Sequence, residues 1–205
     1  MRKIVFCNIS MKEELTPLVY SSGQSSLRTC DEPVAYPLLS VLEDCLGAGD
    51  SVKVVLLCKC DPQKRYLRNV EQFQAEFRER CPGAAGAASF TVLDTEFDEG
   101  QDSAGKLLLD IVNACEPGAA IIGDITYGTK SLPVVLLAAL GFAMKHLDCK
   151  VEHLFYGQVY FQGNQPTEPE LRDLSYLLYL NSLIYTLQCA SPEKAKQTLE
   201  MLLHF

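Results

Sequence analysis

GDITYGTKSLP, residues 123–133, is the stretch that decides the fold. Residues 119–122 before it form a short apolar run, which is typical of a buried parallel strand. Residues 134–144 after it are apolar on almost every side and rich in helix formers, which predicts a helix packed deeply against a sheet. Pro133 is tolerated only in a first helical turn, so the helix should begin near residues 130–133. Open α/β sheets bind ligands at such a junction, outside the carboxyl end of a strand.

The turn itself carries groups that suit an anionic ligand. Thr126, Thr129 and Ser131 offer hydroxyls beside the unpaired N–H groups of a helix start. Gly128 allows positive φ or a close approach of the backbone to a ligand. Lys130 lies at the positive end of the helix dipole, where a cation is mildly disfavoured unless an anion lies in front of it. The alternative is an ordinary exposed loop lysine. The pattern is not a P-loop, because Thr129 separates Gly128 from Lys130.

The rest of the chain alternates between strands and helices. We expect further strands over residues 3–9, 52–59, 88–93 and 150–156, the last with a continuation toward 161, and helices over 34–46, 66–80 and 104–114. This alternation predicts a Rossmann-like, doubly wound α/β fold with a mainly parallel sheet.

A C-terminal helical appendage is expected after the sheet. The predicted boundary gives a ligand-binding domain over residues 1–162 and a tail over 163–205. Residues 163–169 read as a linker, and 168–187 and 192–203 read as helices. Leucines along the first of these helices give it a wide apolar surface, which either packs on the domain, contacts a second subunit or leads to an effector domain.

Composition narrows the function classes. The 205-residue chain has a formal net charge of -8, which excludes a broad basic face for duplex nucleic acid. Its nine cysteines form no C-x-x-C pair and its three histidines are scattered, so no metal site is expected. Cys7 and Cys58 lie in apolar runs, as reduced thiols of a cytoplasmic protein do. No apolar stretch is long enough to cross a membrane, and no G-x-G-x-x-G follows the first strand, so neither a membrane nor a dinucleotide cofactor is expected.

Three segments together resemble the CRISPR-associated Rossmann fold, or CARF, domain. They are the exit of the first strand at residues 8–11, the end of the second strand at 56–59, and above all residues 124–133. The last is similar to the second ligand motif of that family, which has a strand-end aspartate, a threonine, one or two glycines, a threonine and a lysine or arginine. The resemblance covers about residues 1–160. Tyr127 stands where many relatives have Gly or His, and residues 8–11 lack the glycine often found there.

The resemblance implies a homodimer that binds a cyclic oligoadenylate, the second messenger of type III CRISPR antiviral defence. A ring of four or six adenylates can share the two-fold axis of the dimer, so that each subunit supplies the same half-site. The loop over residues 16–32 could cover the ring. The residues expected to contact it are Ser10, Met11, Arg28, Lys59, Asp124, Thr126, Tyr127, Gly128, Thr129, Lys130 and Ser131.

Three functions are compatible with these observations. The preferred one is a sensor that acts on a fused or separate effector, since the chain itself has no R-x-x-x-x-H motif of HEPN ribonucleases. The second is a metal-independent ring nuclease, in which a 2′-hydroxyl of the substrate attacks the adjacent phosphorus and leaves a 2′,3′-cyclic phosphate. In that case Lys130 would stabilise the phosphorane, with Thr129 and Ser10 as orienting donors. The third is an unrelated nucleotide-binding or transcription-regulating Rossmann protein.

Overall fold

A computed structural model describes residues 1–203 apart from 24–26, 48, 97–99 and 164. Within these residues, seven strands form one sheet in the order β2-β7-β6-β5-β1-β3-β4. The parallel strands are β1 (Arg2–Asn8), β3 (Ser51–Cys58), β4 (Ser89–Asp94), β5 (Ala120–Asp124) and β6 (Lys150–Gln162). The long β7 (Gln165–Asp173) runs antiparallel to β6, and the two-residue β2 (Ser21–Ser22) pairs with β7.

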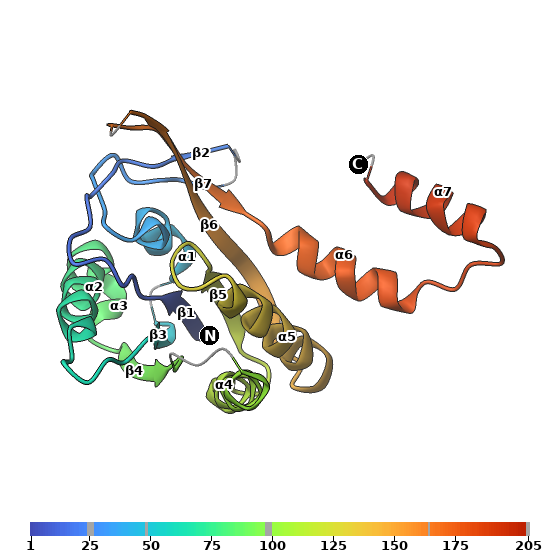
Figure 1. Cartoon of the computed structure of the whole chain (residues 1–205), viewed down its shortest axis with the longest axis horizontal. Helices are drawn as coiled ribbons and strands as arrows, with labels where there is room; N and C mark the ends of the chain where they lie inside the picture. Colours follow the sequence, from blue (N-terminus) through green and yellow to red (C-terminus); the bar gives the residue numbers. More distant parts are fainter. Residues whose placement is uncertain (24–26, 48, 97–99, 164, 204–205) are drawn as a thin grey trace. The chain divides into compact units, whose positions relative to one another are not determined.

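Helices cover both faces of this sheet (Figure 1). One face carries η1 (Pro37–Ser40), α1 (Leu42–Cys45), α2 (Tyr66–Arg80) and α3 (Pro82–Ala85), and the other carries α4 (Gln101–Ala114) and α5 (Ser131–His146). The predicted Rossmann-like, doubly wound fold is therefore confirmed. The order of the strands reverses between β1 and β5, which is the switch point where open α/β sheets bind ligands.

The central strand β1 shows why both faces must be covered. Its last five residues are all buried, as in a parallel strand enclosed between two helical layers. Val5 packs in the same cluster as Phe73 of α2. Phe6 points to the opposite face. Its pairing partner there is Gly123, where an added Cβ atom would lie 4.0 Å from Cδ1 of Leu140 in α5. Successive side chains of β1 therefore pack against α2 on one face of the sheet and toward α5 on the other.

The helix expected over residues 34–46 is wrong. Val34 instead forms an antiparallel bridge with Leu18, and only the short η1 and α1 follow. The reason is Pro37, which lacks an N–H group and disfavours helical angles at the residue before it. Tyr36 accordingly has extended angles, with φ −112° and ψ 114°.

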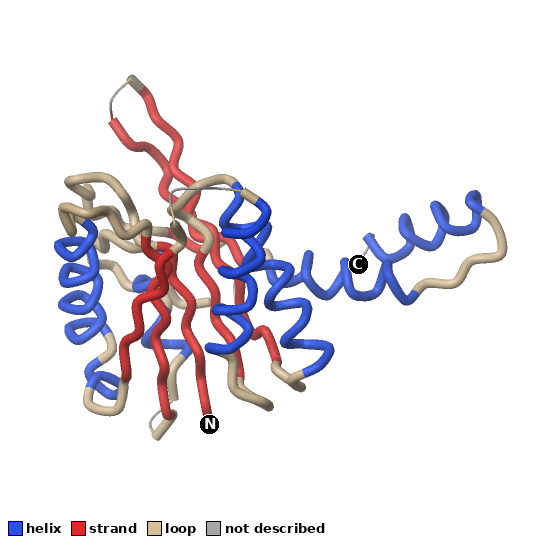
Figure 2. Tube along the Cα trace, turned by 60° about the horizontal axis from the view of Figure 1, so that its bottom comes forward, coloured by secondary structure: helices blue, strands red, loops and turns tan. Residues whose placement is uncertain are grey.

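The linker expected over residues 163–169 is also wrong, as is the start of the helix expected at 168. These residues lie largely in β7, which pairs along β6 after a turn at Gly163, where φ is 65°. Pro166 and Pro169 interrupt any helix here, and Asp173 ends the strand by accepting a hydrogen bond from the Ser175 backbone N–H at 2.8 Å. The tips of β6 and β7 extend beyond the other strands (Figure 2).

The chain divides into two compact units, Met1–Ser175 and Tyr176–Phe205. The unit that contains the sheet therefore extends past residue 162. The second unit holds most of α6 (Ser175–Thr186) and all of α7 (Pro192–Leu203). Among the residues that the structure describes, none of the helices combines the length and the hydrophobicity needed to cross a bilayer.

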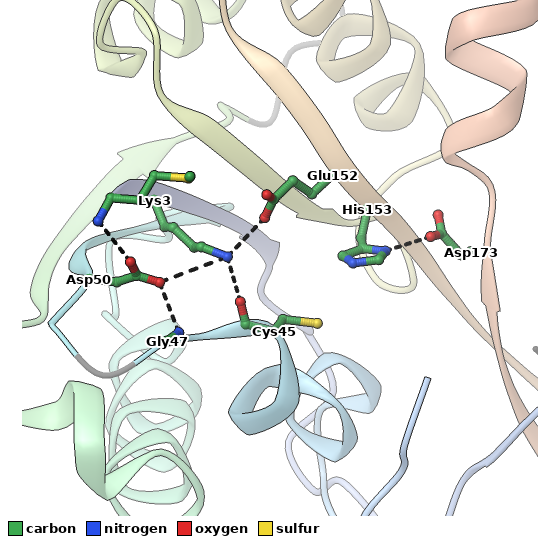
Figure 3. Close-up of polar contacts among 8 residues, drawn as sticks. Lys3, Cys45, Gly47, Asp50, Glu152, His153 and Asp173 are labelled. Carbon is green, nitrogen blue, oxygen red and sulfur yellow. Dashed lines mark hydrogen bonds and ion pairs between the residues drawn. The ribbon is translucent and has the colours of Figure 1, made fainter. Parts of the chain in front are cut away.

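Two polar groups tie the amino edge of the sheet together (Figure 3). Lys3 donates hydrogen bonds to Glu152 at 2.9 Å and to the backbone carbonyl of Cys45 at 2.6 Å. His153 and Asp173 form a second pair, with 2.6 Å between Nδ1 and Oδ2. They link β1, β6, β7 and the end of α1 without contributing to the opposite, carboxyl edge.

The His153–Asp173 pair should make stability fall as the pH rises. Hydrogen bonds with Asp173 and, second, with Cys45 raise the pKa of His153 to about 9. An unfolded histidine has a pKa of about 6.5, so the stabilisation is complete below about pH 6.5 and is lost as the pH rises toward 9. We expect the denaturant midpoint to decrease over this interval. His153→Gln, which cannot titrate, should flatten the profile, and an unchanged slope in this variant would contradict the assignment.

Candidate functional site

Two adjoining clefts open at the carboxyl edge of the sheet. The first, called the aromatic cleft, has a volume of about 670 Å³ and lies between the segment after β1, the turn before α5 and the β6–β7 hairpin. The second, called the basic cleft, has a volume of about 450 Å³ and lies between the ends of β1 and β3 and the start of α2. Ser10, Met11 and Lys12 line both clefts and form the wall between them.

The basic cleft concentrates positive charge on a chain whose net charge is negative. Five basic residues line it against two acidic ones: Lys12, Lys59, Lys64, Arg65 and Arg68 against Glu13 and Asp61. The Asp61 carboxylate is already engaged, because it accepts hydrogen bonds from the backbone N–H and the guanidinium of Arg65, at 3.0 and 3.3 Å. The local field therefore attracts anions, although the chain as a whole repels them.

The aromatic cleft offers flat apolar surfaces and hydroxyls. Its lining includes Tyr20 and Tyr127, which pack in or against the core, the exposed aromatic residues Tyr156 and Phe161, and Thr126 and Thr129. Tyr127 is held in place, since its hydroxyl donates to the Ala35 carbonyl at 2.9 Å and its ring meets Tyr36 edge-on at 5.6 Å. Aromatic rings in such a cleft can stack on nucleobases with little sequence preference.

Asp124 supports this edge of the sheet and is not among the residues that line either cleft. It is buried, and its carboxylate accepts hydrogen bonds from the backbone N–H groups of Thr126 at 2.7 Å and Leu38 at 3.2 Å. Burial raises the pKa of Asp124 to about 6. The carboxylate fixes the β5 exit against η1, which makes Asp124 a positioning residue for the aromatic cleft.

The backbone conformation at position 128 requires a glycine. Its φ is 100°, and a Cβ atom there would lie 2.8 Å from Cδ2 of Leu132 and 3.4 Å from Nδ2 of Asn8. That same amide group of Asn8 donates to the Tyr127 carbonyl at 2.8 Å. The end of β1 therefore clamps the turn, and no other residue fits at position 128 without strain.

The hydroxyls of the turn are partly engaged within the protein. Thr126 Oγ1 accepts the backbone N–H of Gly157 at 2.8 Å, and Thr129 and Ser131 share a hydrogen bond of 3.0 Å. Ser131 lines a small hollow toward α4 and not the aromatic cleft. Lys130 is exposed at the start of α5 and is not among the residues that line either cleft.

The expected residues Ser10, Met11 and Lys59 line the basic cleft. The segment that carries Ser10 and Met11 is held there by a residue that the sequence did not indicate. Asn69 of α2 is buried, and its amide group donates to the carbonyls of Ser10 at 2.7 Å and Lys12 at 2.9 Å. Sequence reasoning also missed Lys12, Lys64, Arg65 and Arg68. The signal for the last three was the basic run that follows Asp61 at the start of a predicted helix.

Arg28 lies elsewhere. It lines a separate hollow of about 370 Å³ with Glu79 and Arg80, at the end of α2 remote from the carboxyl edge. Residues 24–26 of the same loop lie outside the described residues. The earlier part of the loop does reach the site, because Leu15, Thr16, Leu18 and Tyr20 line the aromatic cleft.

The fold and the position of the clefts define a Rossmann-like α/β protein with a site at its topological switch point. Within the described part of the chain, no three or more His, Cys, Asp or Glu residues are grouped to hold a metal ion. No protein-family model matches the chain, and no curated protein does either.

Proposed function

We propose that this protein is a sensor domain that binds a cyclic oligoadenylate at the two adjoining clefts. The observation that carries the proposal is the shared wall of residues 10–12, which separates a basic cleft from an aromatic one. An oligoadenylate alternates between phosphodiester anions and flat bases. Phosphates would occupy the basic cleft, and adenines would stack in the aromatic cleft.

A two-fold symmetric dimer would bind a cyclic oligoadenylate more tightly than a linear one. Two copies of this chain related by a two-fold axis would present the same half-site twice, and a ring with an even number of units can share that axis. The proposal therefore includes a homodimer whose two carboxyl edges face one another. Ligand binding across this interface would be transmitted to a fused or separate effector.

Calorimetric titration tests the proposal directly. Cyclic tetra-adenylate and hexa-adenylate should bind with one ring per dimer, whereas linear tetra-adenylate and AMP should bind much more weakly. Light scattering of the same sample gives the oligomeric state. Mass analysis of the recovered nucleotide then separates the sensor from the ring nuclease, since only the nuclease leaves linear products with a 2′,3′-cyclic phosphate. Equal affinity for AMP and for both rings would contradict the proposal.

Lys130→Ala is expected to weaken binding of the ring without changing stability. Lys130 is exposed at the positive start of α5, next to Thr129 in the aromatic cleft, so it can reach a phosphate that extends from the cleft. Loss of one charge-assisted hydrogen bond should lower the affinity about tenfold. Lys145→Ala, at the other end of α5, removes the same charge away from the site and should bind as the wild type does. Equal affinities of the two variants would show that Lys130 does not contact the ligand.

A further inference from the structure

The second unit of the chain, Tyr176–Phe205, is too small to form a hydrophobic core of its own. It holds most of α6 and all of α7, two helices of 12 residues each, and the chain turns back between them (Figure 1). Both helices are fully described, and Leu178 is the one buried residue within them. Helices of this length are marginal in water, and units of fewer than about 40 residues usually need a disulfide, a metal or association. The second unit therefore needs a partner surface.

The apolar surface of these helices is large enough for a stable contact. On α7, Met201 and Leu203 are exposed. On α6, six large apolar side chains are 41–83% exposed: Tyr176, Leu177, Tyr179, Leu183, Ile184 and Tyr185. An aromatic side chain buries about 150–250 Å² in a contact, so this set offers on the order of 800 Å². One partner of a stable interface contributes about the same area.

The apolar residues of α6 are spaced as in a helical bundle. Tyr176, Leu180, Leu183 and Leu187 follow one another at intervals of four, three and four residues and form the α6 stripe. Leu187 continues the last turn, since its N–H donates to the Leu183 carbonyl at 3.0 Å. This is the repeat of helices that pack against one another along their length. Tyr176 and Leu183 are exposed, so the stripe is open to a further helix.

The second helix, α7, has one apolar and one charged face. Ala195, Leu199 and Leu202 lie on the same side of the helix, at intervals of four and three residues. The charged residues on the other side are Glu193, Lys196 and Glu200. A helix of this kind buries one face and leaves the other in water.

The charge of the second unit favours another copy of the chain as the partner. The unit contains two lysines and two glutamates, all on α7, so the formal net charge of -8 lies entirely in residues 1–175. The sequence of α6 contains no charged residue. A strongly acidic or basic partner would therefore find no opposite charge on α6. Two copies of the same uncharged surface meet there without repulsion.

We propose that the second units of two copies of this chain pack together as a four-helix bundle around a two-fold axis. The α6 stripes of the two copies meet at the centre of the bundle. The apolar face of each α7 covers them, and its charged face stays in solvent. The bundle gives each copy the core that one second unit cannot form alone. Neither cleft takes part in this contact, so the inference does not rest on the function proposed above.

Sedimentation analysis of the full chain over a range of concentrations, without nucleotide, tests the proposal. The wild-type chain should form a dimer. Leu183→Glu with Ile184→Lys places two opposite charges on and beside the α6 stripe and leaves the net charge unchanged. This double variant should raise the dissociation constant by about 100-fold or more. The matched control is Leu109→Glu with Val134→Lys, which makes the same change at exposed apolar residues of α4 and α5 and should remain a dimer.

Two results would overturn the proposal. One is a wild-type chain that stays monomeric at every concentration, a measurement that needs no variant. The other is a dimer that persists in the Leu183→Glu, Ile184→Lys chain, because the contact would then lie outside α6. Hydrogen exchange of the buried strands β1 and β5 verifies that the sheet unit of each variant is folded. The ring ligand is absent from all these measurements, so a failure to bind cyclic tetra-adenylate would leave their outcome unchanged.

Discussion

Charge reversal of Lys12 and Arg68 together is expected to abolish binding of cyclic oligoadenylates. Both side chains are exposed and line the basic cleft, and Lys12 also lines the aromatic cleft. A hydrogen bond to a charged group contributes about 1.5–3 kcal/mol, so the loss of two such contacts alone weakens binding by about 100-fold or more. Repulsion between the new glutamates and the phosphates adds to this loss.

The fold should survive this double substitution. Arg68 lies in the first turn of α2, where a glutamate is favoured by the helix dipole. Lys12→Glu changes an exposed side chain in the segment after β1, whose backbone is held by Asn69. Calorimetry with cyclic tetra-adenylate measures the effect, and denaturant unfolding verifies the fold.

The matched control is Lys194→Glu with Lys196→Glu on α7. Both lysines are exposed, and the double substitution changes the net charge of the chain by the same amount. This control should retain wild-type affinity at moderate ionic strength, apart from a small long-range effect that salt screens. If the two double variants lose affinity equally, net charge and not the basic cleft governs binding.

The order of elements was predictable because local signals sufficed for it. Apolar runs gave the parallel strands, and Gly128 and Asp124 marked the turn where the site lies. Two predictions were wrong, the helix over residues 34–46 and the linker over 163–169. Pro37 breaks an otherwise helical stretch, and β7 forms from a polar, proline-containing segment because β6 offers it an open edge.

The site was only partly predictable, for a different reason. Lys59 and Arg68 come together with Lys12 because β1 and β3 are neighbours and α2 starts at their carboxyl ends. That proximity depends on the order of the strands in the sheet, which no short sequence motif predicts. Arg28 was expected at the site because it belongs to the long polar loop over residues 16–32. In the folded chain it lines a different hollow.

Gly157→Ala is expected to destabilise the sheet unit strongly. Gly157 is buried on β6, opposite Leu171 of β7. An added Cβ would lie 2.5 Å from Cγ and 2.7 Å from Cβ of Pro37, and 3.3 Å from Cγ2 of Thr126. The ring of Pro37 cannot rotate away as a flexible side chain would, and Pro37 itself is buried. One surplus methyl in such packing costs about 1–3 kcal/mol or more, because either β6 or η1 must shift.

Denaturant unfolding of Gly157→Ala beside Gly141→Ala separates packing from the loss of a glycine. Gly141 lies within α5 and has no atom within 4 Å of the added Cβ. In a helix interior the alanine should stabilise by about 0.5–1 kcal/mol. The two variants should therefore move the unfolding midpoint in opposite directions. A Gly157→Ala chain with wild-type stability would show that η1 does not pack against β6 at this point, and the wall of the aromatic cleft formed by β6 would then lose its support.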